Sequence, residues 1–166
     1  ILVVRVYISL GSNIDRERNT RSGVEALRQR LGGLELSSVY ESESVGFEGD
    51  AFYNMVIACE VGEDVHSVNR ALAEIEDAHG RDRSGPRFSS RTLDLDLLLY
   101  DDLVLDENGL RLPREEILKN AFVLWPLAEL APDLVHPVVG KTYAELWVDF
   151  DRSKETLAPI EFAFDG

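Results

Sequence analysis

Two acidic residues, Asp94 and Asp96, have the clearest chemical meaning in this sequence, because they alternate with leucines in the run Arg91–Tyr100. Side chains of a strand point alternately to its two faces, so both carboxylates would share one face, about 7 Å apart, with the leucines on the other. Carboxylate oxygens suit Mg²⁺, which typically takes one or two protein carboxylates and completes its shell with water and substrate phosphates. The alternative is a solvent-exposed strand face without chemical function.

Four arginines, Arg81, Arg83, Arg87 and Arg91, fall within eleven positions just before this pair. The guanidinium group presents a planar fork of donors that matches phosphate oxygens, so such a cluster could clamp a polyphosphate. A solvated loop that balances an acidic surface is the alternative. Carboxylates for magnesium beside arginines for phosphates indicate phosphoryl transfer, which depends mainly on positioning and on neutralising charge.

The composition limits what else the protein can bind. The chain has 166 residues, 45% of them apolar, with 17 Lys and Arg against 31 Asp and Glu, so its net charge is −14. This charge opposes attachment to nucleic acid or to an anionic membrane, and we expect neither partner. The single cysteine, Cys59, lies in an apolar run and should be buried, which fits a cytoplasmic protein. We expect one domain and a monomer.

The periodicity of apolar residues predicts an α+β fold. The expected elements come in the order βαββαβ, which is the ferredoxin-like arrangement of an antiparallel sheet with both helices on one face. The expected elements are a strand over Val3–Leu10 before the turn Gly11-Ser12-Asn13, a helix from Asp15 to Gly32, strands over Leu34–Tyr40 and Asn54–Val61, a helix from Asp64 to Gly80, and the strand Arg91–Tyr100.

Further elements should follow this core. Asp102–Leu112 reads as a hairpin around Asn108-Gly109, which would add strands to the sheet, and Phe122–Ala131 reads as a third helix entered near Pro126. We take residues 1–150 as one catalytic domain and residues 151–166 as a tail to which the sequence assigns no role.

Four segments together resemble the 6-hydroxymethyl-7,8-dihydropterin pyrophosphokinase family of folate biosynthesis, over about residues 4–136. They are Ser9-Leu10-Gly11-Ser12-Asn13, Gly80-Arg81-Asp82-Arg83, Arg91-Thr92-Leu93-Asp94-Leu95-Asp96 and Phe122-Val123-Leu124-Trp125-Pro126-Leu127. The resemblance implies that the β,γ-diphosphate of ATP is transferred to the hydroxymethyl group of the pterin, with AMP released. It also implies two Mg²⁺ ions and a ferredoxin-like fold.

The resemblance also implies roles for individual residues. Asp94 and Asp96 would hold the metal, and Arg81 and Arg91 would join them as catalytic residues. Arg81, Arg83 and Arg91 would contact the phosphates of ATP. This chain lacks the further arginines with which the family reaches the nucleotide, so we expect Arg111 to supply that charge, with Arg114 and Lys119 as alternatives. The pterin would lie in a pocket containing Gly11, Ser42, Val45, Phe52, Asn54, Phe88 and Phe122.

Two other classes of function compete with this hypothesis. Another magnesium-dependent nucleotidyl or phosphoryl transferase could use the same aspartates, but a polymerase-like enzyme would need a basic track for nucleic acid. A non-catalytic ferredoxin-like ligand-binding module would leave the adjoining arginines and aspartates unexplained. The three histidines, His66, His79 and His136, read as structural.

Overall fold

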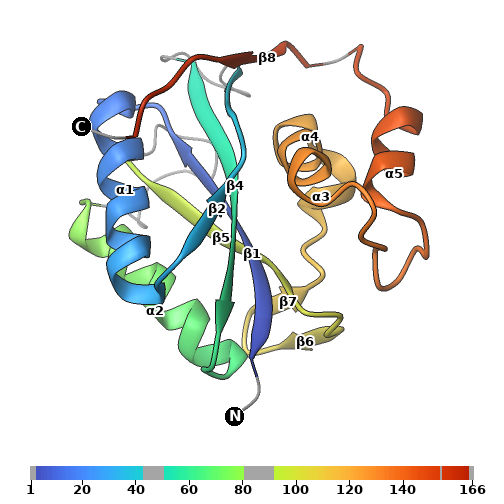
Figure 1. Ribbon diagram of the computed structural model, residues 1–166, viewed down its shortest axis with the longest axis horizontal. Coiled ribbons are helices and arrows are strands. Elements are labelled where there is room, and N and C mark those ends of the chain that lie inside the picture. Colours follow the sequence, from blue (N-terminus) through green and yellow to red (C-terminus); the bar gives the residue numbers. More distant parts are fainter. Residues whose placement is uncertain (1–2, 43–50, 81–91, 154, 165–166) are drawn as a thin grey trace.

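The computed structural model describes residues 3–42, 51–80, 92–153 and 155–164. Figure 1 shows a central sheet with helices on both sides. The elements are β1 (Val4–Ser12), α1 (Arg16–Leu31), β2 (Leu34–Leu36), β3 (Val39–Ser42), β4 (Phe52–Val61), α2 (Val65–Ala78), β5 (Asp94–Tyr100), β6 (Leu105–Glu107), β7 (Leu110–Leu112), α3 (Glu116–Lys119), α4 (Ala121–Leu130), α5 (Tyr143–Asp149) and β8 (Leu157–Ile160).

The main sheet is antiparallel throughout, with the strand order β5-β1-β4-β3-β8 and with β2 also paired to β4. Helices α1 and α2 lie on one face, as expected, while α3, α4 and α5 lie on the other (Figure 1). The predicted α+β class with an antiparallel sheet is therefore confirmed, and both faces of the sheet are covered.

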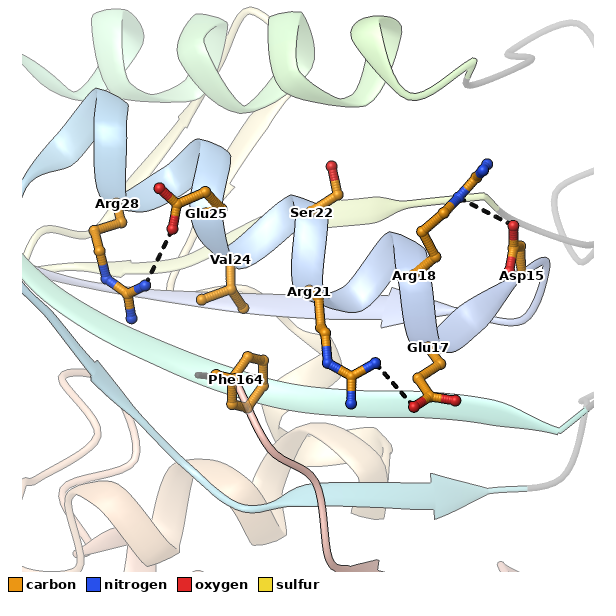
Figure 2. Close-up of a pocket in the computed structure, with 9 residues that line it drawn as sticks. All are labelled: Asp15, Glu17, Arg18, Arg21, Ser22, Val24, Glu25, Arg28 and Phe164. Carbon is orange, nitrogen blue, oxygen red and sulfur yellow. Dashed lines mark hydrogen bonds and ion pairs between the residues drawn. The ribbon is translucent and has the colours of Figure 1, made fainter. Parts of the chain in front are cut away.

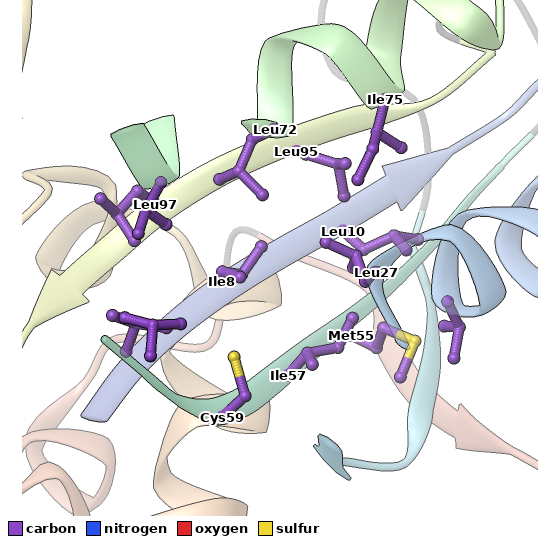
Figure 3. Packing of buried hydrophobic residues seen from close by; sticks show 14 of the residues in the cluster. Ile8, Leu10, Leu27, Met55, Ile57, Cys59, Leu72, Ile75, Leu95 and Leu97 are labelled. Atoms are coloured by element: carbon purple, nitrogen blue, oxygen red, sulfur yellow. The ribbon is translucent and has the colours of Figure 1, made fainter. Parts of the chain in front are cut away.

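Between the sheet and helices α1 and α2 lies the larger part of the core (Figure 3). Strand residues of alternating positions, such as Ile8 and Leu10 of β1 and Leu95 and Leu97 of β5, meet helix residues there. Cys59 belongs to the same cluster and is a free, buried thiol, as predicted. Alternation along the strands thus places every second side chain in this layer.

A second apolar layer lies between the sheet and α4. It joins Tyr7 of β1, Val56 of β4 and Leu99 of β5 to Leu124 and Leu127 of α4. Strand β5 is buried on both faces near its end, since Leu97 packs in the first layer and Leu98 and Leu99 pack in the second. The pairing with β1 shifts between Tyr7 and Ile8, so that Leu98 falls between the paired residues Leu97 and Leu99. This irregularity accommodates the continuous leucines that end the strand.

Helix α4 begins at Ala121 and contains Pro126 within it, so the predicted entry near that proline is wrong. A proline inside a helix removes one backbone hydrogen bond and usually bends the helix or ends it. Here the helix tolerates it because Val123, Leu124 and Leu127 are buried against the sheet. The burial of this apolar face outweighs the tendency of proline to bend or end a helix.

Strand β1 runs through Gly11 and Ser12, which the sequence analysis assigned to a turn. The assignment is wrong because both residues have partners in the sheet, with Gly11 paired to Asn54 on β4 and to Asp94 on β5. Ser12 Oγ also donates to the backbone oxygen of Thr92 at 2.6 Å. Gly11 therefore lies inside the sheet.

The predicted strand Leu34–Tyr40 is divided into β2 and β3. From Leu36 opposite Ile57 to Tyr40 opposite Asn54, one chain advances four residues and the other three, so β2–β3 carries one extra residue. Ser37 stabilises this bulge, because its backbone N–H donates to Val56 O at 3.0 Å and its Oγ accepts the Val56 N–H at 2.9 Å. The bulge reverses which side chains of β3 share a face with β4.

The hairpin around Asn108 and Gly109 forms as predicted, with φ values of 51° and 77° at its turn. It does not extend the main sheet, however, and β6 and β7 make a separate two-stranded sheet. The outer edge of β5 is already hydrogen-bonded to other elements, since Leu95 N–H donates to Glu76 and Leu98 O accepts the Arg114 N–H. The strand that the main sheet gains is β8, from the C-terminal segment.

The helix ends follow the expected capping signals in part, because Asp15 precedes α1 but its side chain makes no capping hydrogen bond. Asp64 caps α2 by accepting the Ser67 N–H at 2.9 Å, and Gly80 follows the helix with a φ of 77°. Gly32, with a φ of 95°, ends α1. Within the described ranges, no helix combines the length and the apolar character that a membrane span requires.

Candidate active site

Strand β5 presents Asp94 and Asp96 on the face of the sheet opposite Leu95 and Leu97. Both leucines are buried in the layer under α1 and α2, whereas both aspartates are partly exposed. The predicted alternation is therefore confirmed. The aspartates share their face with Tyr7 and Val56, which pack against α4.

Three chemically relevant residues form a row across three adjacent strands. Gly11 of β1 lies opposite Asp94 on one side and opposite Asn54 of β4 on the other. Directly paired residues of antiparallel strands project to the same face, with Cβ atoms about 4.5–5.5 Å apart. Asp94 and Asn54 are thus separated by one glycine, which leaves the surface between them without a side chain.

The buried amide of Asn54 is fixed by Ser42, whose Oγ accepts its Nδ2–H at 2.6 Å. A Cβ atom on Gly11 would lie 3.2 Å from Asn54 Oδ1 and 3.7 Å from Phe52 Cδ1. Hence Asn54 Oδ1 and the Phe52 ring both lie over the glycine backbone. The structure therefore brings together four residues assigned to the pterin pocket: Gly11, Ser42, Phe52 and Asn54.

Phe122 comes from a different element, as the second residue of α4. It is partly buried and packs against the apolar layer between α4 and the sheet. Helix α4 lies on the face of the sheet opposite α1 and α2 (Figure 1). Asp94 and Asn54 project to this same face, so Phe122 belongs to an element on their side of the sheet. Its contact with the pterin stays a prediction.

Two arginines near β7 have different surroundings. Arg111 lies on the hairpin, is largely exposed and pairs with Glu115 at 3.4 Å. Arg114 is less exposed, and its Nη2 lies 3.3 Å from Asp96 Oδ1 while its Nε donates to Glu116 at 2.8 Å. Burial alone would lower the pKa of the Arg114 guanidinium, but Asp96 and Glu116 outweigh it and raise the pKa. Of these two arginines, Arg114 contacts the acidic pair.

Glu76 of α2 is a residue that the sequence analysis missed. Its carboxylate is buried and accepts the N–H of Leu95, between the two aspartates, at 2.8 Å. Burial raises the pKa of Glu76 to about 7, and the nearby Asp94 and Asp96 charges act in the same direction. The position could have been noticed, because Glu76 follows Leu72 by four residues and so lies on the apolar face of its helix.

Several assigned residues lie outside the described part of the chain. They are Arg81, Arg83, Arg87, Arg91, Val45 and Phe88. In the described ranges, no group of three or more His, Cys, Asp or Glu residues is arranged to hold a metal ion. On the site face, strand β5 supplies the two carboxylates of Asp94 and Asp96.

A hollow of about 570 Å³ lies elsewhere, on the outer side of α1 (Figure 2). Its charged side chains pair with one another, as in Arg18 with Asp15 at 3.0 Å and Arg21 with Glu17 at 2.8 Å. Helix α1 covers the face of the sheet that is opposite to the acidic pair, so this hollow is separate from the candidate site. Its lining residues are Asp15, Glu17, Arg18, Arg21, Ser22, Val24, Glu25, Arg28 and Phe164.

Comparison with known proteins identifies sequence relatives over most of the chain. Residues 7–132 match the family model for 7,8-dihydro-6-hydroxymethylpterin-pyrophosphokinase. A 2-amino-4-hydroxy-6-hydroxymethyldihydropteridine pyrophosphokinase of Aquifex aeolicus is 31% identical over 157 residues, covering 93% of this chain and 94% of the relative. The enzyme of the same name from Pseudomonas aeruginosa is 37% identical over 140 residues, covering 82% and 86%.

Some relatives are much longer proteins. The chain spans 21% of a folic acid synthesis protein of Dictyostelium discoideum, to which it is 32% identical over 82% of its own length. Among solved structures, wild-type HPPK-DHPS of Plasmodium falciparum with pteroate matches with a TM-score of 0.70 at 14% identity. That match covers 89% of this chain and 42% of the other, and at this identity it supports the fold alone.

Proposed function

Since the chain belongs to the 7,8-dihydro-6-hydroxymethylpterin-pyrophosphokinase family, and is thus an ATP-dependent diphosphotransferase of folate biosynthesis, we propose that its reaction takes place on the sheet face carrying Asp94, Asp96 and Asn54. One observation carries this proposal. Asp94, Gly11 and Asn54 form a continuous row across β5, β1 and β4, so that the acidic pair and the buried Asn54 amide are adjacent on one face.

The reaction joins two bound substrates. The hydroxymethyl oxygen of the pterin forms a bond to the β-phosphorus of ATP, the bond from that phosphorus to the bridging oxygen of the α-phosphate breaks, and AMP leaves with this oxygen. The hydroxyl proton is released. Such a transfer requires in-line placement of the two substrates and compensation of phosphate charge.

Asp94 and Asp96 are the residues that would hold magnesium. Their side chains fit the ion, because two carboxylates on one rigid strand supply hard oxygen ligands and leave room for water and phosphate oxygens. We propose two ions at this position, which would neutralise phosphate charge and lower the pKa of the attacking hydroxyl. Glu76 and Arg114 keep the strand and the Asp96 carboxylate in place.

The pterin would lie over Gly11, beside Asn54. Asn54 donates one of its two Nδ2 hydrogens to Ser42. Its Oδ1 can accept a hydrogen bond from the pterin edge, and the second Nδ2 hydrogen can donate one. Phe52 from β4 and Phe122 from α4 provide aromatic faces suited to a flat heterocycle. In this proposal Val45 and Phe88 complete the pocket.

The triphosphate of ATP would extend from the acidic pair towards the arginines. We assign Arg81, Arg83 and Arg91 to its phosphates because they adjoin β5 in sequence and because guanidinium groups bind phosphate in a bidentate manner. Arg111 remains a candidate for the nucleotide charge, but the contact of Arg114 with Asp96 makes Arg114 the better placed of the two.

The wider organisation follows from the same proposal. The order β5-β1-β4 with β2 and β3 next, and α1 and α2 on one face, supports a ferredoxin-like core with additional C-terminal elements. We propose that residues 1–150 form the diphosphotransferase domain, attached to the segment 151–166 through β8. The free, buried Cys59 supports a cytoplasmic protein, and the net charge of −14 supports ATP and the pterin as partners rather than nucleic acid. We propose that the protein is a monomer.

The test is to incubate the protein with ATP, Mg²⁺ and 6-hydroxymethyl-7,8-dihydropterin and to identify the nucleotide product. We expect AMP and a pterin that has gained a diphosphate. Formation of ADP would indicate ordinary phosphoryl transfer, and no reaction would favour a binding module; either result would contradict the proposal.

The acidic pair is tested with Asp96→Asn against Asp106→Asn, which removes an exposed carboxylate on β6. We expect the first variant to lose at least about a thousandfold in kcat, since charge neutralisation is a major part of the catalysis. The second should match the wild type. An active Asp96→Asn variant would place the metal elsewhere.

A further inference from the structure

The C-terminal segment contacts the start of the helix that carries Phe122. Both carboxylate oxygens of Glu155 lie 3.0 Å from the backbone N of Ala121, whose N–H they accept. Asn120, at the N-cap position of α4, makes no side-chain hydrogen bond to the helix. Glu155 therefore supplies the cap that Asn120 does not, from 34 residues further along the chain.

The same segment pairs with the strand that carries Ser42. In β8, Leu157 lies opposite Ser42, and Ile160 lies opposite Val39. Strand β3 has only four residues and follows the bulge at Ser37, so pairing on both edges, with β4 and with β8, is what holds its register. Strand β8 thus holds the outer edge of the strand whose register turns Ser42 towards Asn54.

Aromatic and cationic contacts anchor the end of the segment. The Phe162 ring lies edge-on to Tyr53 at 5.7 Å, and the Arg21 guanidinium lies 4.5 Å from the centre of the Phe162 ring. Arg21 Nε also donates to the backbone oxygen of Ala163 at 2.8 Å. The segment is therefore attached at both ends, to α4 through Glu155 and to α1 through Arg21.

We propose that residues 155–164, which lie outside the stretch matched by the family model, are a positioning element for the pterin subsite. Glu155 sets the start of α4 and thereby the Phe122 ring, while β8 sets Ser42 and through it the Asn54 amide. This inference rests on the proposed function of the site. Because its two contacts are with the start of α4 and with β3, the element acts on pterin binding rather than on ATP.

The experiment compares Glu155→Ala with Glu161→Ala. Both variants remove one carboxylate from the same segment, but Glu161 is exposed and follows β8. We expect Glu155→Ala to raise KM for the pterin about five- to tenfold, as befits a lost charged hydrogen bond, with KM for ATP unchanged. The amide oxygen of Glu155→Gln can still accept the N–H, so its KM for the pterin should lie between that of Glu155→Ala and that of the wild type.

Each outcome decides the inference. Equal pterin KM values for Glu155→Ala and Glu161→Ala would overturn it. If Glu155→Ala raised KM for the pterin and KM for ATP equally, the inference would also be overturned, because such a result indicates a general loss of structure. If Glu155→Ala does not fold, Glu155→Gln is compared with Glu161→Ala in the same way. A wild-type protein that forms no AMP would instead contradict the proposed function, so the two failures are distinguishable.

Discussion

Gly11 shows how a single residue can shape a binding surface. Its backbone lies between Asp94 and Asn54, and nothing projects from it. A methyl group at this position would meet Asn54 Oδ1 at 3.2 Å and the Phe52 ring at 3.7 Å. The glycine is therefore needed for access to the asparagine, and its φ is not in the left-handed region, so substitution by alanine introduces no backbone strain.

We expect Gly11→Ala to raise KM for the pterin about tenfold, which corresponds to ~1.4 kcal/mol of lost binding. The added methyl group displaces the Asn54 amide and occupies the space that the flat ring needs. Steady-state kinetics with each substrate varied in turn provides the measurement. An unchanged pterin KM together with an altered KM for ATP would show that the nucleotide lies over this glycine instead.

Arg111 and Arg114 differ in the carboxylates that they contact. Arg114→Ala removes the cation that contacts Asp96, whereas Arg111→Ala removes one that pairs with Glu115 on the exposed hairpin. An exposed ion pair contributes about 0–1 kcal/mol of interaction free energy, while a cation that pairs with a partly buried carboxylate contributes more. We therefore expect the larger loss of kcat/KM for ATP in Arg114→Ala. The opposite ranking would assign the nucleotide charge to Arg111.

At the scale of elements, the position of α1 on the sheet depends on Gly23. An added Cβ there would lie 2.9 Å from Leu93 Cδ1 and 3.2 Å from Leu10 Cδ1, both in buried side chains. Alanine would favour the helix by about 1 kcal/mol, but overpacking of a core costs about 1–3 kcal/mol. The close packing of α1 thus helps to fix the positions of the strands that carry Gly11 and Asp94.

We expect Gly23→Ala to lower the free energy of unfolding by about 1 kcal/mol, measured by urea denaturation. Gly33→Ala is the matched control, because a Cβ at Gly33 meets nothing within 4 Å. If Gly23→Ala proved as stable as Gly33→Ala, the leucines would have room to move and the helix would not be held as closely as its contacts suggest.

The loop before α5 is organised by the buried imidazole of His136. Its Nδ1 accepts the N–H groups of Val138 and Val139 at 3.2 and 3.1 Å, which requires the neutral ring with its proton on Nε2. The ring also packs edge-on against Tyr143. Burial lowers the pKa of His136 below its ordinary value of 6.5.

The unfolded chain therefore binds the proton more readily than the folded protein, and the stability that His136 contributes is present above pH 6.5 and lost as the pH falls below it. His136→Asn retains an acceptor near the Nδ1 position but does not titrate. We expect the stability difference between wild type and this variant to shrink between pH 7.5 and pH 5. A difference that stays constant with pH would mean that the ring is not held neutral.

For the molecule as a whole, the excess of 14 negative charges should oppose compactness. Raising NaCl from about 10 mM to about 150 mM shortens the screening length from about 30 Å to about 8 Å. We expect this change to raise the midpoint of thermal unfolding by about 2–5 °C, measured by circular dichroism. Salt also weakens stabilising ion pairs such as Arg30 with Glu63. A lowered midpoint would therefore show that the loss of these ion pairs outweighs the relief of repulsion.

Much of the fold follows from local sequence. The apolar periodicities identified α1, α2 and the strands of the sheet, and the alternation around Leu95 placed Asp94 and Asp96 on one face. Local signals succeed here because the period of a strand or helix is a property of the backbone itself. The paired aspartates could therefore be recognised before any tertiary contact was known.

Tertiary structure decided which residues meet. The one-residue bulge at Ser37 determines that Ser42 faces Asn54, and the cap on α4 comes from the distant Glu155. The contact of Arg114 with Asp96 likewise joins separate elements. Register and capping depend on hydrogen-bond partners far away in the chain, and a linear sequence does not state which donors and acceptors lie opposite one another. The types of element and the identity of the acidic pair came from sequence, whereas Asp94, Gly11 and Asn54 lie side by side only because three strands align.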